Sequence, residues 1–153
     1  MFEKEKTLIY LGSDHAGFGM KEMVKKQLEG DQYKTVDLGA FSEESVDYPD
    51  FAREVAEKVL ETEGAWGVLV CGSGIGVCMA ANRFKGIRAG MCRTVEDAEM
   101  TRKHNNANVL CLGGRVTDME VAKQIVEKFL LTEFESGEER HVRRVKKMDE
   151  MGK

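Results

Sequence analysis

The chain has 153 residues, close to the usual size of one domain, so a second independent core is not expected. Apolar residues make up 42% and charged residues 33%, with a single proline, which excludes disordered and collagen-like chains. The net charge of −4 comes from 23 basic and 27 acidic residues in mixed order, which argues against nucleic acid as a partner.

The amino-terminal stretch carries no targeting or membrane signal. Met1 to Lys6 is a charged extension, and the apolar run Leu8–Leu11 is too short for a signal peptide or a membrane span. We therefore expect a cytoplasmic protein with no membrane partner, folded as one domain over residues 1–153.

Short apolar runs alternate with longer amphipathic stretches along the whole chain. Most of these runs have strand length and end at glycine or a polar residue, as buried parallel strands do. They are Leu8–Leu11, Thr35–Leu38, Trp66–Cys71, Ile87–Cys92 and Asn108–Leu112. Five strands, each followed by a helix, predict a doubly wound (Rossmann-like) α/β fold with a largely parallel sheet and helices on both faces.

The helical patterns between the strands are clearest near the carboxyl terminus. Val121, Ile125 and Phe129 recur at helical spacing, and we expect Thr117 and Asp118 to open this helix with Glu120 at a capping-box position. A separate basic helix is predicted over about 138–151. Ligands of doubly wound folds bind beyond the carboxyl ends of the strands, so the residues that follow the strands are the first candidates for a site.

Asp14 and His15 follow the first strand, within Gly12-Ser13-Asp14-His15-Ala16-Gly17. An Asp-His pair at this place faces the ligand crevice. The alternative is that Ser13 or Asp14 caps the next helix and His15 is merely exposed.

The third strand ends at Cys71 and is followed by Gly72-Ser73-Gly74-Ile75-Gly76. Its glycines allow a close approach to a ligand, and the helix start behind them favours an anion and the thiolate form of a cysteine. A dinucleotide fingerprint would follow the first strand, and a cysteine-phosphatase loop needs Arg where Val77 stands. A glycine-rich turn with an inert cysteine remains the alternative. Cys92 and Cys111 lie in apolar runs and are expected to be small buried hydrophobes.

Basic residues close the chain and follow the last strand. Arg115 follows the fifth strand, and His104 ends the helix before it, where a histidine is usually a helix cap. Arg140 and Arg144 are four residues apart, share one helix face and could hold a phosphate. The alternative for such a charge run is a solvated helix face.

These blocks together resemble type B ribose-5-phosphate isomerase, whose family includes the galactose-6-phosphate isomerase subunits. The resemblance runs from about Thr7 to Met148. Its motifs are Ser-Asp-His-Ala-Gly-Phe (13–18), Glu-Ser-Val-Asp-Tyr-Pro-Asp (44–50), Cys-Gly-Ser-Gly-Ile-Gly (71–76), Ala-Ala-Asn-Arg (80–83), Gly-Ile-Arg-Ala (86–89) and His-Asn-Asn-Ala-Asn-Val-Leu (104–110). Asn106, where members often have Asp, and the Glu138-Glu139 pair depart from the family pattern.

The resemblance implies a role for each matching position. Cys71 corresponds to the base, Ser73 to the hydroxyl beside it, and His104 to the acid that opens the sugar ring. The implied substrate contacts are Asp14, His15, the backbone of Gly72, Ser73, Gly74, Ile75 and Gly76, Asn105, Arg115, Arg140 and Arg144. The family's sites take ligands from two subunits, so a homodimer or a dimer of dimers is implied.

The chemistry of aldose–ketose isomerisation agrees with these residues. The reaction needs a base, donors for an enediolate oxygen, a ring-opening group and a phosphate anchor, but no cofactor and no metal. The expected function is therefore interconversion of ribose 5-phosphate and ribulose 5-phosphate. The alternatives are an isomerase of allose or galactose 6-phosphate, a phosphate- or nucleotide-binding module without catalysis and, more weakly, a basic-helix interaction protein.

Overall fold

Five apolar segments form one sheet in which every neighbouring pair of strands is parallel. The computed structural model describes residues 7–152, so the expected charged extension over 1–6 lies outside the described residues. The strand order is β2-β1-β3-β5-β4. The strands are β1 (Leu8–Ser13), β2 (Lys34–Asp37), β3 (Trp66–Cys71), β4 (Ala89–Met91) and β5 (Val109–Gly113).

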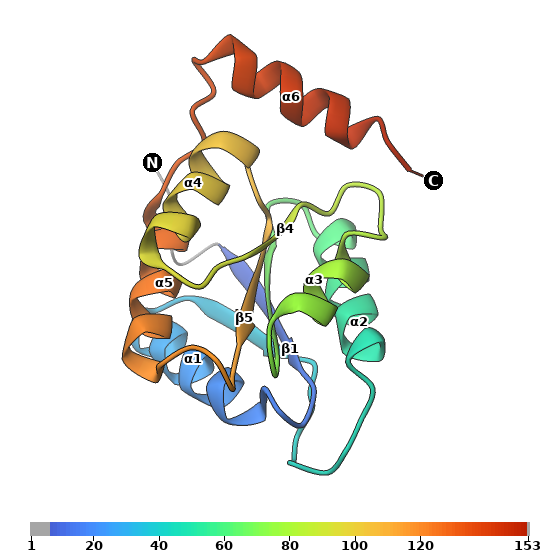
Figure 1. Cartoon of the computed structure of the whole chain (residues 1–153), viewed down its shortest axis with the longest axis vertical. Helices are drawn as coiled ribbons and strands as arrows, with labels where there is room; N and C mark the ends of the chain where they lie inside the picture. Colours follow the sequence, from blue (N-terminus) through green and yellow to red (C-terminus); the bar gives the residue numbers. More distant parts are fainter. Residues whose placement is uncertain (1–6, 153) are drawn as a thin grey trace.

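Helices cover both faces of this sheet, which confirms the doubly wound α/β prediction (Figure 1). α1, α4 and α5 pack on one face, and α2 and α3 pack on the other. The helices are α1 (Phe18–Gly30), α2 (Tyr48–Glu61), α3 (Ile75–Ala81), α4 (Val95–Asn105), α5 (Met119–Leu131) and α6 (Glu139–Asp149). No helix among residues 7–152 is long and apolar enough to cross a membrane.

Successive strand residues feed two separate apolar cores. Ile9 and Leu11 of β1 pack with Phe129 of α5, whereas Tyr10 between them packs with Val55 of α2. This alternation is the two-residue period of a strand with both faces covered. Cys92 and Cys111 are fully buried in these cores, as the sequence predicts.

Two strands differ from their expected lengths, each because of a specific hydrogen bond. β1 continues through Ser13, whose N–H donates to the Gly39 carbonyl at 2.7 Å, so Gly12 and Ser13 belong to the strand and not to the turn. β4 begins only at Ala89, because the Arg88 N–H donates to the Asn108 side chain at 2.8 Å instead of joining the ladder.

The predicted capping box of α5 is wrong, and a capping box occurs in α4 instead. Asp118 alone caps α5, accepting from the Glu120 N–H at 2.9 Å. In α4, the Thr94 hydroxyl accepts from the Asp97 N–H while the Asp97 carboxylate accepts from the Thr94 N–H. The reciprocal pair needs the acidic residue three positions after the cap, and Val121 occupies that position in α5.

A buried ion pair joins α1 to the end of β2. The Lys21 ammonium is fully buried and donates to the Asp37 carboxylate at 2.7 Å. Burial by itself raises the pKa of Asp37, but the hydrogen bonds from Lys21 and the Gly39 N–H and the charges of Lys21 and Lys25 lower it overall. A carboxyl group whose pKa is lower in the folded chain stabilises the fold above its unfolded pKa, and this contribution is lost as the pH falls through the folded value.

We expect Asp37→Asn to destabilise the protein by up to about 3–5 kcal/mol at pH 7, because the buried Lys21 ammonium then keeps only the more exposed Glu22 carboxylate, 3.3 Å away. Urea unfolding at several pH values measures this, with exposed Asp31→Asn as the matched control. The stability gap between wild type and Asp37→Asn should begin to narrow near the unfolded pKa of about 3.9 and close as the pH falls through the lower folded pKa of Asp37. A gap that is small at pH 7, or equal at every pH, would contradict this account of the pair.

Candidate active site

A pocket of about 420 Å³ lies at the edge of the sheet where β1, β3 and β5 end. Its lining comes from the three turns that follow β1, β3 and β5 and from the starts of α2 and α3. The residues are Asp14, Tyr48, Cys71, Gly72, Ser73, Gly76, Arg115 and Val116. β1 and β3 are neighbours on either side of the point where the chain reverses its direction across the sheet, which is the usual ligand position in this fold class.

Cys71 is the last residue of β3, and only 4% of it is exposed. Its Sγ accepts the Gly74 N–H at 3.2 Å, and the Ser73 hydroxyl accepts the Ile75 N–H at 3.2 Å. Backbone N–H groups at the start of α3 therefore converge on the sulfur and hydroxyl of this loop. Such an arrangement of backbone N–H groups favours a negatively charged oxygen bound at this loop.

Glycine is required at two positions of this loop. Gly74 has φ of +81°, and a Cβ there would lie 2.9 Å from the Leu112 carbonyl carbon. A Cβ at Gly76 would lie 2.7 Å from the Tyr48 ring, which packs directly on the loop. Tyr48 is a pocket residue that our sequence reasoning did not single out, although it lies within the 44–50 motif beside Pro49.

Of the Asp14-His15 pair, only Asp14 lines the pocket, whereas His15 contacts the segment before α2. Asp14 lines the pocket, and its Oδ1 accepts the Gly17 N–H at 3.0 Å just before α1. The alternative that Ser13 or Asp14 caps α1 is wrong, because the cap residue is Gly17 and no side chain caps this helix. His15 is not among the lining residues, and its Nδ1 accepts the Val46 N–H at 3.2 Å. The Nε2 of a neutral His15 therefore carries the proton.

Arg115 places a cation at the rim of the pocket. Its N–H donates to the Gly72 carbonyl at 2.9 Å, and its side chain runs past Gly72. The neighbouring Gly114 N–H donates to the Cys71 carbonyl at 2.8 Å. These two hydrogen bonds join the turn after β5 to the Cys71 loop. The backbone that carries the Arg115 guanidinium is therefore held directly against the backbone that carries the Cys71 thiol.

His104 and Asn105 lie at the opposite edge of the sheet. They end α4, which precedes β5, whereas Cys71 pairs with Gly113 at the far end of that strand. The ladder from Val109 to Gly113 alone spans about 13 Å. Asp14, Cys71 and Arg115 lie at or just after the carboxyl ends of strands, as expected for candidate site residues. His104 and Asn105 precede a strand and do not fit that expectation.

The two arginines of α6 lie on the same side of the molecule as His104. Figure 1 shows α6 beyond α4, away from the turns that follow β1, β3 and β5. Both Arg140 and Arg144 are exposed, and the only described carboxylate within ion-pair distance of Arg140 is that of Glu138, at 3.6 Å. One chain therefore carries the expected site as two separate halves.

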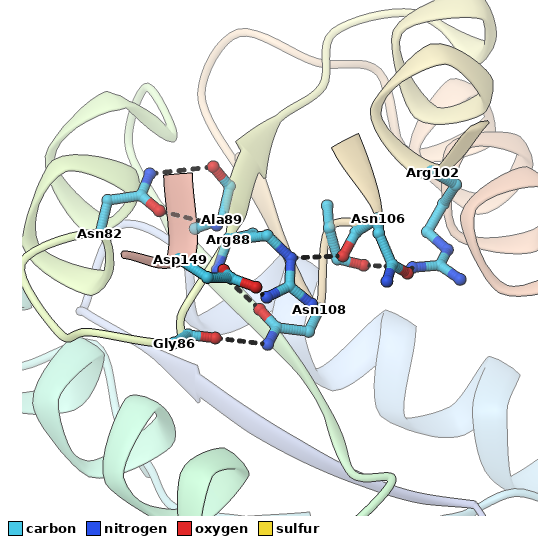
Figure 2. A network of polar contacts seen from close by, with 9 residues as sticks. Asn82, Gly86, Arg88, Ala89, Arg102, Asn106, Asn108 and Asp149 are labelled. Carbon is cyan, nitrogen blue, oxygen red and sulfur yellow. Dashed lines mark hydrogen bonds and ion pairs between the residues drawn. The ribbon is translucent and has the colours of Figure 1, made fainter. Parts of the chain in front are cut away.

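A network centred on Arg88 fixes the carboxyl end of α6 (Figure 2). The Arg88 guanidinium donates to the Asn106 carbonyl at 2.9 Å and to the Asp149 carboxylate at 2.8 Å. The Asn108 side chain accepts from the Arg88 N–H and donates to the Gly86 carbonyl at 3.0 Å. The Gly-Ile-Arg-Ala and Asn-Asn-Ala-Asn motifs thus connect β4, α4 and α6.

The other end of α6 packs on the His104 ring. His141 is buried, and its ring centroid lies 4.4 Å from that of His104 with the planes at 40°. The Nδ1 of His141 lies 3.1 Å from a Glu135 carboxylate oxygen. Neither His141 nor Glu135 was singled out from the sequence. His141 and Val145 are four residues apart and are the two buried residues of α6. This spacing was the signal in the sequence that could have placed His141 on the inward face of the helix.

Comparisons with known proteins agree on one family. The sequence model described as ribose/galactose isomerase matches residues 9–148. The chain is 46% identical over 143 residues to "Probable ribose-5-phosphate isomerase B" of Mycoplasma genitalium, covering 92% of each chain. It is 42% identical to ribose-5-phosphate isomerase B of Escherichia coli, over 90% of this chain and 91% of that one.

Solved structures confirm the relationship. A ribose 5-phosphate isomerase of Thermotoga maritima superposes with a TM-score of 0.91 at 47% identity, over 95% of this chain and 99% of that one. The Mycoplasma genitalium ribose-5-phosphate isomerase B with bound ribulose 5-phosphate has a TM-score of 0.89 at 41% identity, over 94% and 95% of the chains. The chain therefore belongs to the ribose/galactose isomerase family.

Proposed function

We propose that this chain interconverts ribose 5-phosphate and ribulose 5-phosphate through an enediolate, with Cys71 as the base. The observation that carries the proposal is the Cys71 sulfur in the pocket, with the Gly74 N–H directed at it from 3.2 Å. A relative of 41% identity is a ribose-5-phosphate isomerase B with bound ribulose 5-phosphate, which supports the pentose over a hexose as substrate.

The reaction moves one proton between two neighbouring carbons and one between their oxygens, and it leaves the carbon skeleton unchanged. The Cys71 thiolate takes the proton from the carbon beside the aldehyde, and the electron pair moves to the carbonyl oxygen. The loop N–H groups and Ser73 stabilise the negative oxygen. The hydroxyl proton on the neighbouring carbon's oxygen passes to the former aldehyde oxygen, and the Cys71 thiol returns its own proton to the former aldehyde carbon, which yields the ketose.

A second copy of the chain completes the site in this proposal. His104 of that copy opens the furanose ring, Asn105 contacts the sugar, and Arg140 and Arg144 hold the phosphate beside Arg115. The distance between the two halves of one chain supports this division, because residues at opposite edges of a sheet cannot contact one small sugar. Arginine suits a phosphate because its planar fork holds two oxygens at once.

We expect Cys71→Ala to lower kcat by about 10²–10⁴-fold while ribulose 5-phosphate still binds, because the phosphate anchor is intact. Steady-state kinetics and calorimetry measure the two quantities. Cys78→Ala is the control, because a hydrogen bond with the Cys111 thiol lowers the pKa of Cys78 to about 7, yet Cys78 lies outside the pocket. Near-normal turnover in Cys71→Ala would remove it as the base.

We expect His104→Asn to block ribose 5-phosphate turnover but not proton exchange at the enediolate carbon. Ribulose 5-phosphate cannot close a five-membered ring through its phosphorylated oxygen, so its exchange with D₂O needs no ring opening. Proton NMR follows this exchange, and Cys71→Ala should lose both activities. If His104→Asn loses exchange and turnover equally, the ring-opening role is wrong.

Mixing two inactive variants tests the shared site. One chain carries Cys71→Ala and the other carries Arg140→Ala with Arg144→Ala. A mixed dimer would hold one site with both lesions and one with neither, so activity should return toward half per mixed dimer. Mass spectrometry under native conditions reports subunit exchange. Exchange without recovery would place the arginines at their own chain's site or at none.

A further inference from the structure

Three side chains with metal-binding atoms converge where α6 packs against α4. His104 comes from α4, Glu135 from the connection between α5 and α6, and His141 from the first turn of α6. One ligand atom from each lies within 4.8 Å of the other two. The proposed isomerisation uses only His104 of the three, so Glu135 and His141 have no assigned task.

The Glu135–His141 contact has the spacing of two ligands of one ion. The His141 side chain is 5% exposed, and its Nδ1 lies 3.1 Å from Glu135 Oε2. Among the described residues, this nitrogen nevertheless has no partner in hydrogen-bond geometry. Two ligand atoms about 2.1 Å from a tetrahedral ion lie about 3.4 Å apart. A buried ring nitrogen without a hydrogen bond is costly, and coordination would satisfy it.

We propose that His104, Glu135 and His141 form a binding site for one divalent transition-metal ion, with Zn²⁺ as the fitting example. Two imidazole nitrogens and one carboxylate oxygen are a donor set that zinc accepts, with a fourth position left for water. His104 is half-buried in the last turn of α4, and its ligand nitrogen lies within 4.8 Å of the other two ligand atoms. A rotation of its ring would bring this nitrogen to the same ion.

The neighbouring cations do not oppose an ion at this place. Lys103 is paired with Glu99, and Arg140 lies 3.6 Å from Glu138, so each positive charge has a nearby carboxylate. Glu135 contributes a negative charge to the site itself. Within one chain, these three residues lie at the other edge of the sheet from the Cys71 pocket, and only His104 is shared with the proposed isomerase site.

Occupation by zinc would switch off the ring-opening step. A metal bound to the His104 imidazole takes the lone pair that the histidine needs to carry a proton. This consequence rests on the proposed function of His104, whereas metal binding itself does not. Zinc should therefore inhibit turnover of the cyclic sugar phosphate and leave enediolate exchange from ribulose 5-phosphate in place.

Titration of the metal-free full chain with Zn²⁺, in competition with a chromophoric chelator, tests the site. We expect one ion per chain, with Glu135→Gln and His141→Gln each weakening binding at least about tenfold. Glu133→Gln, which changes an exposed carboxylate two residues away, and Cys78→Ser, which removes a half-buried thiol outside the cluster, are matched controls that should bind as wild type does. Equal affinity in all four variants, or no binding by wild type, would overturn the proposal.

Co²⁺ provides a test that needs no substitution. Tetrahedral Co²⁺ with nitrogen and oxygen ligands gives visible bands without the charge-transfer absorption of a thiolate, and that spectrum is the expected one. A thiolate band would overturn the site by placing the ion on cysteine. Inhibition separates the two proposals: zinc bound with these ligands but without effect on ribose 5-phosphate turnover supports the metal site and contradicts the role of His104.

Discussion

The parallel arrangement of the sheet is the constraint on which the rest of the structure depends. When all strands point the same way, every turn from strand to helix lies at one edge and every turn from helix to strand lies at the other. Cys71 and Arg115 follow strands, whereas His104 and Asn105 precede one. Their separation is therefore fixed by topology and cannot be removed by the movement of a loop.

At the edge of the sheet where the strands end, the turns that carry the site pack closely on one another. The turn after β5 is hydrogen-bonded to the Cys71 loop, and Gly74 lies against the Leu112 backbone at a distance that no side chain could share. The loop N–H groups are held by the fold before any ligand arrives. Donors that are already oriented stabilise a developing negative charge without reorganising during the reaction.

Most of the fold could be predicted from the sequence, because apolar runs of strand length are bounded by glycine and polar residues throughout. Two of the errors occur where a side chain supplies a hydrogen bond that periodicity does not anticipate. Asn108 takes the Arg88 N–H and shortens β4, and Asp118 caps α5 without a reciprocal partner. Such contacts depend on residues that meet only in the folded chain, so periodicity carries no information about them.

The site could be predicted in part for the same reason. Cys71 and its loop stand out locally, because glycines, a thiol and a strand end are adjacent in the sequence. The Tyr48 ring reaches Gly76 from 28 positions earlier, and Glu135 reaches His141 only through the bend before α6. The family resemblance identifies individual positions, but the division of those positions between two edges follows from the sheet alone.

The attachment of α6 at both ends has a consequence for assembly. Asp149 is held by Arg88 at one end, and His141 is buried against His104 at the other, so the helix between them is ordered by its own chain. In the proposed dimer, the arm that carries Arg140 and Arg144 meets its partner as a rigid element rather than as a flexible tail. The conformational entropy of ordering that arm is then lost during folding, and subunit association and sugar binding proceed without that cost.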